Sequence, residues 1–140
     1  MGIEQETAVR TFVGEWEGAQ WDAAQIDRML SRMAAGARYQ VYAWEDPLVG
    51  HEAIRTELLR QAPLFGDFRS EIVTIGSVGQ TVFTERLDSM TINGKQLALH
   101  VAGVFDVDSD GKIAAWRDYL DTKEVEVKVG AGVSSAGTRG

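Results

Sequence analysis

Two stretches near the N-terminus carry hydrophobic residues at three- and four-residue intervals, a spacing that predicts amphipathic helices. The first helix is expected over 4–18, with apolar positions at Val9, Phe12, Val13 and Trp16. The second is expected to begin after Asp22, whose carboxylate suits a helix N-cap, and to end at Gly36. A third helix is expected over 50–61, where apolar residues recur with the same period.

Alternating hydrophobic and polar residues fill most of the remaining chain and predict β-strands. A first strand is expected over 38–44, and four longer strands are expected over 67–78, 80–91, 96–108 and 112–123. Asn-Gly at 93–94 and Asp-Gly at 110–111 favour tight hairpin turns between the last three strands. The order of elements predicts an α+β fold in which three to four helices pack on a curved, mixed but mostly antiparallel sheet. Such a sheet forms a cone-shaped pocket that can hold a ligand.

Composition narrows the class of protein. The chain has 140 residues, 44% of them hydrophobic and 25% charged, which fits one globular domain, expected over 1–129. Residues 130–140 are small and polar, so we expect a flexible tail there. No apolar run reaches the roughly 20 residues of a membrane-spanning helix, and the start of the chain lacks the features of a secretion signal. We therefore expect a cytoplasmic protein with no membrane partner.

Charge and metal-ligating residues exclude further classes of function. A net charge of −7 argues against binding to nucleic acid, which requires a clustered basic surface. The chain has no cysteine and only two histidines, so neither a disulfide framework nor a metal site built from these residues is expected. We expect a small neutral or cationic ligand instead.

Three charged residues fall on strand faces that otherwise carry apolar side chains. Arg86 and Asp88 share a face of one expected strand, and Asp118 lies on the apolar face of the last. A guanidinium between two carboxylates would offset the cost of burying these charges. Repulsion separates the two titration steps of such a pair, so that one carboxyl can donate a proton while the other accepts one. This is the requirement for acid and base catalysis of a ring opening by water. A solvent-facing ion pair of Arg86 with Asp88 is the alternative.

Strand alternation also predicts a hydrophobic wall around this charged set. The residues expected on the same face of the sheet are Met90, Leu99, Val101, Trp116 and Leu120. A pocket lined in this way would suit a small hydrophobic substrate.

Three sequence blocks resemble the conserved blocks of the limonene-1,2-epoxide hydrolase family: VFTERLD at 82–88, GVF at 103–105 and GKIAAWRDYLD at 111–121. The resemblance covers most of the chain and implies the cystatin-like fold of the nuclear-transport-factor-2-like superfamily. It also implies opening of a small hydrophobic epoxide to a vicinal diol in one step, with no cofactor and no covalent intermediate. In that scheme Asp118 takes a proton from water, Asp88 protonates the epoxide oxygen, and Arg86 holds both carboxylates.

One position departs from the family pattern. Family members hold the attacking water with a Tyr-x-Asn pair, whereas this chain has Tyr39, Gln40 and Val41. Tyr39 is therefore expected among the catalytic residues, and Val41 in the pocket wall cannot hydrogen-bond to water. Two alternatives stay open: an epoxide-opening cyclase or isomerase that uses a hydroxyl of the substrate, and a ligand-binding domain without turnover.

The resemblance also implies a homodimer that forms through the outer face of the sheet. The residues expected on that face, away from the pocket, include Ala102, Val104 and Tyr119, which are apolar enough to permit association.

Overall fold

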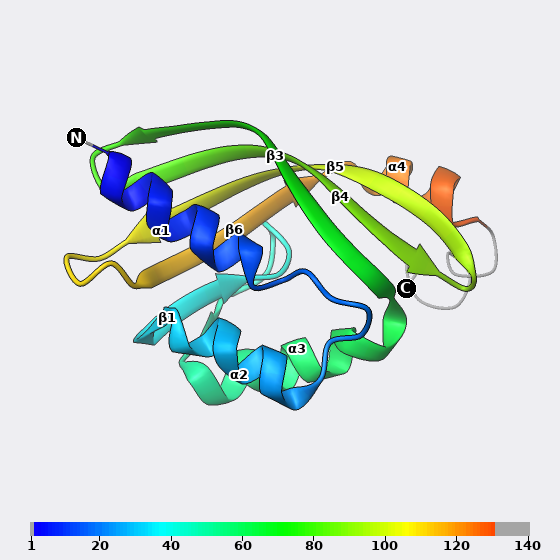
Figure 1. The fold of residues 1–140 in the computed structure, drawn as a ribbon, viewed down its shortest axis with the longest axis horizontal. Helices are drawn as coiled ribbons and strands as arrows, with labels where there is room; N and C mark the ends of the chain where they lie inside the picture. Colours follow the sequence, from blue (N-terminus) through cyan, green and yellow to red (C-terminus); the bar gives the residue numbers. More distant parts are fainter. Residues whose placement is uncertain (1, 131–140) are drawn as a thin grey trace.

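A computed structural model of the protein describes residues 2–130 (Figure 1). Its helices are α1 (Ile3–Gly14), α2 (Ala23–Ser31), α3 (His51–Gln61) and α4 (Thr122–Val129), with a short 3-10 helix at Ala62–Leu64. Its strands are β1 (Met33–Gln40), β2 (Leu48–Val49), β3 (Gly66–Val78), β4 (Thr81–Ile92), β5 (Lys95–Val107) and β6 (Ile113–Leu120).

The strands form one sheet in the order β2-β1-β6-β5-β4-β3. β1 pairs with β6 in parallel, and every other neighbouring pair is antiparallel. In Figure 1 the long strands curve around α1, while α2 and α3 lie beside β1. The predicted fold, a curved and mostly antiparallel mixed sheet with helices, is confirmed.

The boundaries of several predicted elements are wrong. α1 ends at Gly14 rather than at residue 18, and α2 ends at Ser31 rather than at Gly36. The segment 33–37 instead begins β1: Met33 pairs in parallel with Ile113 of β6, and the pairing resumes at Arg38 after an irregular stretch. Its sequence, Met-Ala-Ala-Gly-Ala, has no alternation that could reveal a strand. Tertiary pairing therefore decides the conformation of a stretch whose local preference is weak.

The first and last strands also stop earlier than predicted. β1 ends at Gln40, so that Val41 and the residues up to Glu45 form a bend instead of completing a strand over 38–44. β6 ends at Leu120, and Asp121 caps α4 by accepting a hydrogen bond from Lys123 N at 2.8 Å. The predicted strand 112–123 is too long for this reason. The predicted tail over 130–140 lies outside the described residues except for its first residue.

The core is rich in aromatic residues that pack between α1 and the sheet. Trp16 stacks on Trp116 of β6 with 4.9 Å between ring centroids, and the edge of Phe12 meets the Trp116 ring at 5.3 Å. Phe105 of β5 lies beside the same group, 6.2 Å from Phe12. All four side chains are buried. This cluster forms the floor beneath the charged residues of the sheet.

Helix α4 covers an open edge of the sheet. β6 stops opposite Val101, so the part of β5 before that point has no strand partner on this side. Glu124 Oε1 accepts a hydrogen bond from His100 N at 3.0 Å, and Lys128 Nζ donates to Ala98 O at 2.7 Å. The helix therefore satisfies backbone groups that a longer β6 would have paired.

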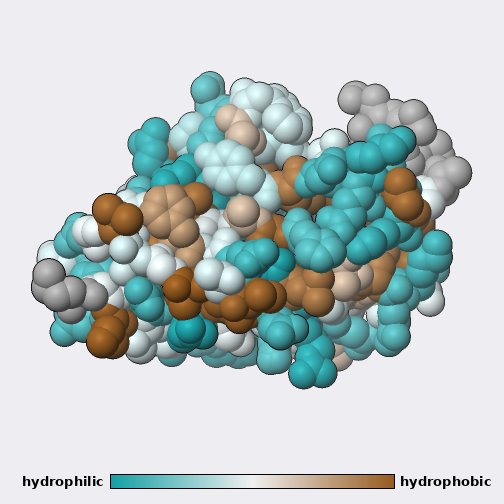
Figure 2. Space-filling model, turned by 90° about the horizontal axis from the view of Figure 1, so that it is seen from above, coloured by the Kyte–Doolittle hydropathy of each residue, from teal (hydrophilic) through white to brown (hydrophobic). Residues whose placement is uncertain are grey.

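The outer face of the sheet carries mixed side chains. Ala102 is exposed, Val104 is half-buried and Tyr119 is 44% exposed. Figure 2 shows brown hydrophobic patches between teal hydrophilic ones on the face that it views. The homodimer expected through the outer face stays a prediction. Within residues 2–130, no helix has the length and hydropathy needed to cross a membrane.

Candidate active site

Arg86 lies between two carboxylates from different strands. Its Nη2 and Nε donate to Asp88 at 3.0 and 3.2 Å, and its Nη1 and Nη2 donate to Asp118 at 3.1 Å each. The Arg86 side chain is fully buried, whereas 8% of Asp88 and 18% of Asp118 is exposed. The structure thus brings together the three charged residues predicted from the sequence, and it excludes the alternative of a solvent-facing Arg86–Asp88 pair.

The backbone makes room for the guanidinium at Gly103. The register places Gly103 of β5 between Thr84 of β4 and Asp118 of β6. A Cβ at this position would lie 2.2 Å from Arg86 Nη1 and 2.9 Å from Asp118 Oδ1. No side chain larger than hydrogen fits there without moving the ion pairs, which explains the glycine in the GVF block.

Burial and charge act on the pKa values of this group in different directions. Burial lowers the pKa of Arg86, but the combined attraction of Asp118 and Asp88 raises it further, so that the guanidinium stays charged. The guanidinium carbon also lies 4.9 Å from the centre of the Trp16 ring, a cation–π contact that favours the charged form. For Asp118, burial raises the pKa, and this effect outweighs the lowering by Arg86. Asp118 is therefore a stronger base than a carboxylate in water.

Asp88 has a further partner that sequence reasoning missed. Ser70 of β3 lies directly opposite Asp88 in the register, and Ser70 Oγ donates to Asp88 Oδ1 at 2.6 Å. The signal in the sequence is weak, because a serine in a long strand is typical of an exposed position. Only the pairing of β3 with β4 reveals the contact.

Tyr39 of β1 is held close to Asp118. The Tyr39 ring stacks on Trp116 with 4.1 Å between centroids, and its hydroxyl accepts a hydrogen bond from Gln61 Nε2 at 3.3 Å. Burial and then the negative charge of Asp118 raise the pKa of Tyr39, so that the hydroxyl keeps its proton. Because the Tyr39 oxygen accepts from Gln61, its own proton is free to point toward another acceptor. Among residues 2–130 the buried Trp116 Nε1–H makes no hydrogen bond of normal geometry, but its attraction for the Asp118 carboxylate lowers the pKa of Asp118 slightly against the effect of burial.

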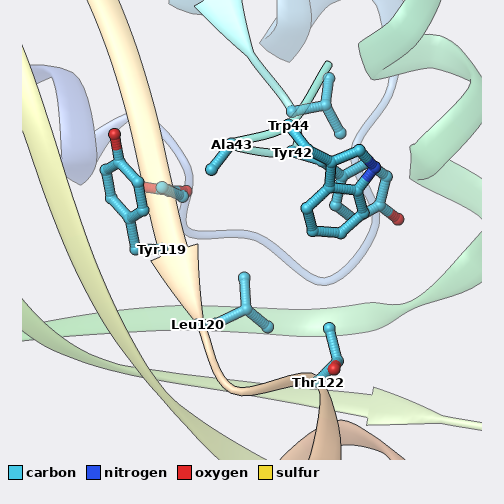
Figure 3. A pocket seen from close by; sticks show the side chains of 8 residues that line it. Tyr42, Ala43, Trp44, Tyr119, Leu120 and Thr122 are labelled. Carbon is cyan, nitrogen blue, oxygen red and sulfur yellow. The ribbon is translucent and has the colours of Figure 1, made fainter.

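A cavity of about 80 Å³ opens onto Asp118 (Figure 3). It lies between the bend that follows β1 and the junction of β6 with α4. Its lining residues are Val41, Tyr42, Ala43, Trp44, Asp118, Tyr119, Leu120 and Thr122. In Figure 3 Ala43 and Trp44 lie on one side, opposite Leu120 and Thr122. The rings of Tyr42 and Trp44 stack at 4.9 Å, and 73% of Trp44 is exposed, so this aromatic pair stands at the mouth.

The predicted hydrophobic wall divides into two parts. Val41 and Leu120 line the cavity beside Asp118, although Val41 lies in the bend and not in a strand. The other predicted wall residues do not line it: Met90, Leu99, Val101 and Trp116, all of which are buried. Arg86, Asp88 and Met90 alternate along β4, and Leu99 and Val101 face Asp88 and Arg86 in the register. These buried residues therefore pack beside Arg86 and Asp88 instead of lining the cavity.

Comparisons with known proteins agree on one family. A family model of the limonene-1,2-epoxide hydrolase catalytic domain matches residues 3–129. The chain is 41% identical to epoxide hydrolase EphG of Mycobacterium tuberculosis over 68 residues, which are 49% of this chain and 45% of that relative. The match therefore spans less than half the length of this curated relative.

Solved structures agree in fold over a longer range. The structure of an M. tuberculosis limonene-epoxide-hydrolase-like epoxide hydrolase is 30% identical with a TM-score of 0.69, covering 86% of this chain and 84% of that one. A Catenulispora acidiphila protein with a ketosteroid isomerase-like fold, solved with trimethylamine, is 19% identical with a TM-score of 0.73, covering 86% and 90%. A nuclear-transport-factor-2-like protein of unknown function from Burkholderia pseudomallei is 16% identical with a TM-score of 0.73, covering 91% and 98%. The last two support the fold alone.

Proposed function

The chain belongs to the limonene-1,2-epoxide hydrolase family, and we propose that it adds water to a small hydrophobic epoxide and releases a vicinal diol without a cofactor. The observation that carries this proposal is the Arg86 guanidinium, fully buried between the carboxylates of Asp88 and Asp118. A buried ion pair is not needed for stability, because apolar residues often fill such space as well or better. Two carboxylates on one cation beside a cavity are the arrangement that acid and base catalysis requires.

In the proposed reaction, water attacks one carbon of the epoxide ring as the bond from that carbon to oxygen breaks. Asp118 accepts the proton that the water loses, and Asp88 gives its proton to the ring oxygen. The new hydroxyl of the diol therefore keeps one hydrogen of the water, and the hydroxyl formed from the ring oxygen carries the proton from Asp88. The two aspartates have exchanged protonation states. Arg86 bonds to both carboxylates and stabilises whichever one is ionised.

The raised pKa of Asp118 supports its assignment as the base. Burial destabilises the Asp118 carboxylate relative to its protonated form, and a base of higher pKa takes a proton more readily. Asp118 also lines the cavity, whereas Asp88 does not line it and is less exposed. Water entering from the mouth would thus meet Asp118.

Tyr39 is proposed to hold the attacking water together with Asp118. Its hydroxyl accepts from Gln61 and can therefore donate to a water oxygen. Val41 offers no hydrogen bond where the family has asparagine, so Tyr39 and Asp118 would hold the water without that third anchor. Misplacement of the water would cost on the order of a hundredfold in rate, so one such anchor matters.

The apolar side chain of Val41 beside Asp118 favours a second candidate, an epoxide-opening cyclase or isomerase. In that reaction a hydroxyl of the substrate replaces water as the nucleophile, and Asp118 takes its proton. Val41→Asn should then increase hydrolysis of simple epoxides, because it restores a water anchor. No gain in hydrolysis from this variant would remove the support for the cyclase.

The test is turnover of a panel of epoxides in ¹⁸O-labelled water, with products analysed by mass spectrometry. Wild-type protein should give singly labelled diol. Asp118→Asn and Asp88→Asn should each lower the rate by at least about a hundredfold while remaining folded. Asp106→Asn is a matched control, because Asp106 also pairs with an arginine on this sheet, Arg117 at 3.1 Å, but is 40% exposed.

Two results would contradict the proposal. If Asp118→Asn or Asp88→Asn kept near wild-type diol formation, the assigned roles would be wrong. If wild-type protein bound apolar amides or diols tightly but turned over no epoxide, the chain would be a ligand-binding domain that keeps the fold. Unlabelled cyclic ethers from hydroxy-epoxides would support the cyclase.

A further inference from the structure

The two oxygens of Asp88 have different surroundings. Asp88 Oδ1 accepts from Ser70 Oγ at 2.6 Å and from Arg86 Nε at 3.2 Å. Within the described part of the chain, Oδ2 accepts from Arg86 Nη2 alone, at 3.0 Å. A carboxyl proton is disfavoured on an oxygen that already receives two hydrogen bonds, because the donors compete with it for the same lone pairs. The proton of Asp88 therefore belongs on Oδ2.

We propose that Ser70 is a positioning residue that directs the transferable proton of Asp88 to Oδ2 and strengthens Asp88 as the acid. This inference rests on the proposed function. It assigns a role to a residue of β3, a strand that contributes none of the three residues Arg86, Asp88 and Asp118. Ser70 does not touch the reacting atoms. Its hydroxyl donates to Oδ1 and stabilises the negative charge that remains on Asp88 after Oδ2 releases the proton.

The pairing of β3 with β4 fixes the position of Ser70 next to Asp88. Ser70 and Asp88 are directly opposed in an antiparallel pair, and Ile72 faces Arg86 two residues along the same strands. Cross-strand partners on one face lie within reach of short side chains, so the serine hydroxyl needs only one rotamer to meet the carboxylate. β3 is the outermost strand of the sheet, so that the hydroxyl reaches the charged group from its rim.

Asp88 accepts hydrogen bonds from two residues, and Ser70 is the one that carries no charge. Arg86 lies on the same strand, and Asp118 reaches the group from β6 through the guanidinium. The residues opposite Asp88 are Ser70 on β3 and Leu99 on β5, neither of which carries a charge. Removing the hydroxyl therefore leaves every ion pair in place.

The experiment compares Ser70→Ala, Ser70→Thr and a matched control, Ser77→Ala. Ser77 lies on the same strand and donates to a carboxylate oxygen of Glu6 at 2.9 Å, away from the charged group. Ser70→Ala should lower kcat about tenfold with little change in KM, because proton donation is weakened while substrate contacts stay. The alkaline limb of kcat/KM should move upward by roughly one pH unit, since a weaker acid keeps its proton to higher pH. Ser70→Thr should restore both properties, and Ser77→Ala should change neither.

Three results would overturn the role of Ser70. The first is wild-type kcat and an unmoved alkaline limb in Ser70→Ala. The second is a fall in kcat in Ser70→Thr equal to that in Ser70→Ala. Because threonine keeps the hydroxyl, the effect would then come from side-chain shape and not from the hydrogen bond. The third is an equal loss in Ser77→Ala, which would make it a general effect on β3. If Ser70→Ala fails to fold, a comparison of Ser70→Val with Ser70→Thr gives the same test. Valine and threonine have nearly the same shape, but valine has a methyl group where threonine has the hydroxyl.

A measurement without substrate separates this inference from the proposed function. Proteins with ¹³C-labelled aspartate carboxyl groups are titrated by NMR, and the Asp88 signal is assigned from its loss in Asp88→Asn. A titration of this signal that moves to higher pH in Ser70→Ala, but not in Ser77→Ala, supports the role of Ser70 even if no epoxide is turned over. An unmoved titration overturns it even if diol forms, in which case the proposed function stands alone.

Discussion

A cluster of charged side chains on the strands and another beside α4 both place carboxylates against basic groups, and they behave in opposite ways. The strand cluster, Arg86 with Asp88 and Asp118, lies inside the sheet with its guanidinium fully buried. The α4 cluster, Glu124 with His100 and Lys128, lies at the surface, where Glu124 Oε2 is 2.6 Å from His100 Nδ1 and 2.8 Å from Lys128 Nζ. The contact distances of the α4 cluster are the shorter ones, but its histidine is 73% exposed.

The difference shows that environment, and not the number of ion pairs, decides what a carboxylate does. In the α4 cluster, hydrogen bonds from Lys128 and His100 lower the pKa of Glu124 to about 2. In the strand cluster, burial raises the pKa of Asp118 even though two guanidinium nitrogens contact it. The two carboxylates themselves are about equally exposed, 17% for Glu124 and 18% for Asp118, but Arg86 is fully buried whereas His100 and Lys128 are 73% and 38% exposed. Only the second is suited to taking up a proton during a reaction.

Removing the cation should give the largest difference in stability loss between the two clusters. Arg86→Met leaves two carboxylates buried and unpaired, and should cost about 3–5 kcal/mol of unfolding free energy along with all measurable diol formation. Lys128→Met removes a cation that is 38% exposed and should cost less than about 1 kcal/mol. Denaturant unfolding at neutral pH measures both changes. Similar losses in the two variants would contradict the distinction drawn from burial.

Crowding the strand cluster should give the next largest effect. Gly103→Ala places a Cβ 2.2 Å from Arg86 Nη1, so the guanidinium must shift, at a cost of about 1–3 kcal/mol and with reduced activity. Gly76→Ala on β3 is the matched control, because nothing lies within 4 Å of the added Cβ. Thermal unfolding and kcat/KM measure the two effects. A Gly103→Ala protein with wild-type activity would show that the charged group tolerates displacement.

The pH dependence of activity should report the raised pKa of Asp118. A base works when deprotonated, so kcat/KM should fall as pH drops below the pKa of Asp118, by up to tenfold per pH unit. Because burial raises that pKa, the fall should begin at higher pH than the value near 3.8 of an ordinary aspartate would give. A profile from pH 3.5 to 9 measures this limb, and Asp106→Asn should leave it unmoved. Full activity down to pH 4 would contradict the assignment of Asp118 as a buried base.

The sequence predicted the strand cluster more reliably than the elements around it. Arg86, Asp88 and Asp118 were found because period-two alternation assigns a face to each strand residue, and both strands are long enough to show it. The start of β1 and the presence of α4 could not be read in the same way. β1 forms through pairing with β6, and α4 begins where Asp121 caps it after a sequence, Trp-Arg-Asp-Tyr-Leu, that alternates as a strand does.

Hydrogen bonds between residues far apart in the chain could not be predicted from the sequence either. Ser70 meets Asp88 because of the register of β3 with β4, and Gln61 meets Tyr39 because α3 packs near β1. Neither distance follows from residue types or local periodicity. Strand alternation and the family blocks both pointed to the three charged residues, whereas their neutral hydrogen-bonding partners became visible only when the strands were paired.

The smallest effect is expected in the α4 cluster and tests its role as a cover for β5. Glu124→Gln keeps a side chain that can accept from His100 N but removes the charge, so hydrogen exchange of the His100 amide should speed up only a few-fold while activity is unchanged. The lowered pKa sets the pH window: the contribution of the Glu124 charge to stability is present above the ordinary value of 4.5 and is lost as pH falls toward about 2. Wild type and Glu124→Gln should therefore differ in unfolding free energy at pH 7 and converge near pH 2. A difference that persisted at pH 2 would mean that the carboxylate acts through packing rather than charge, and the comparison with Asp118 would then fail.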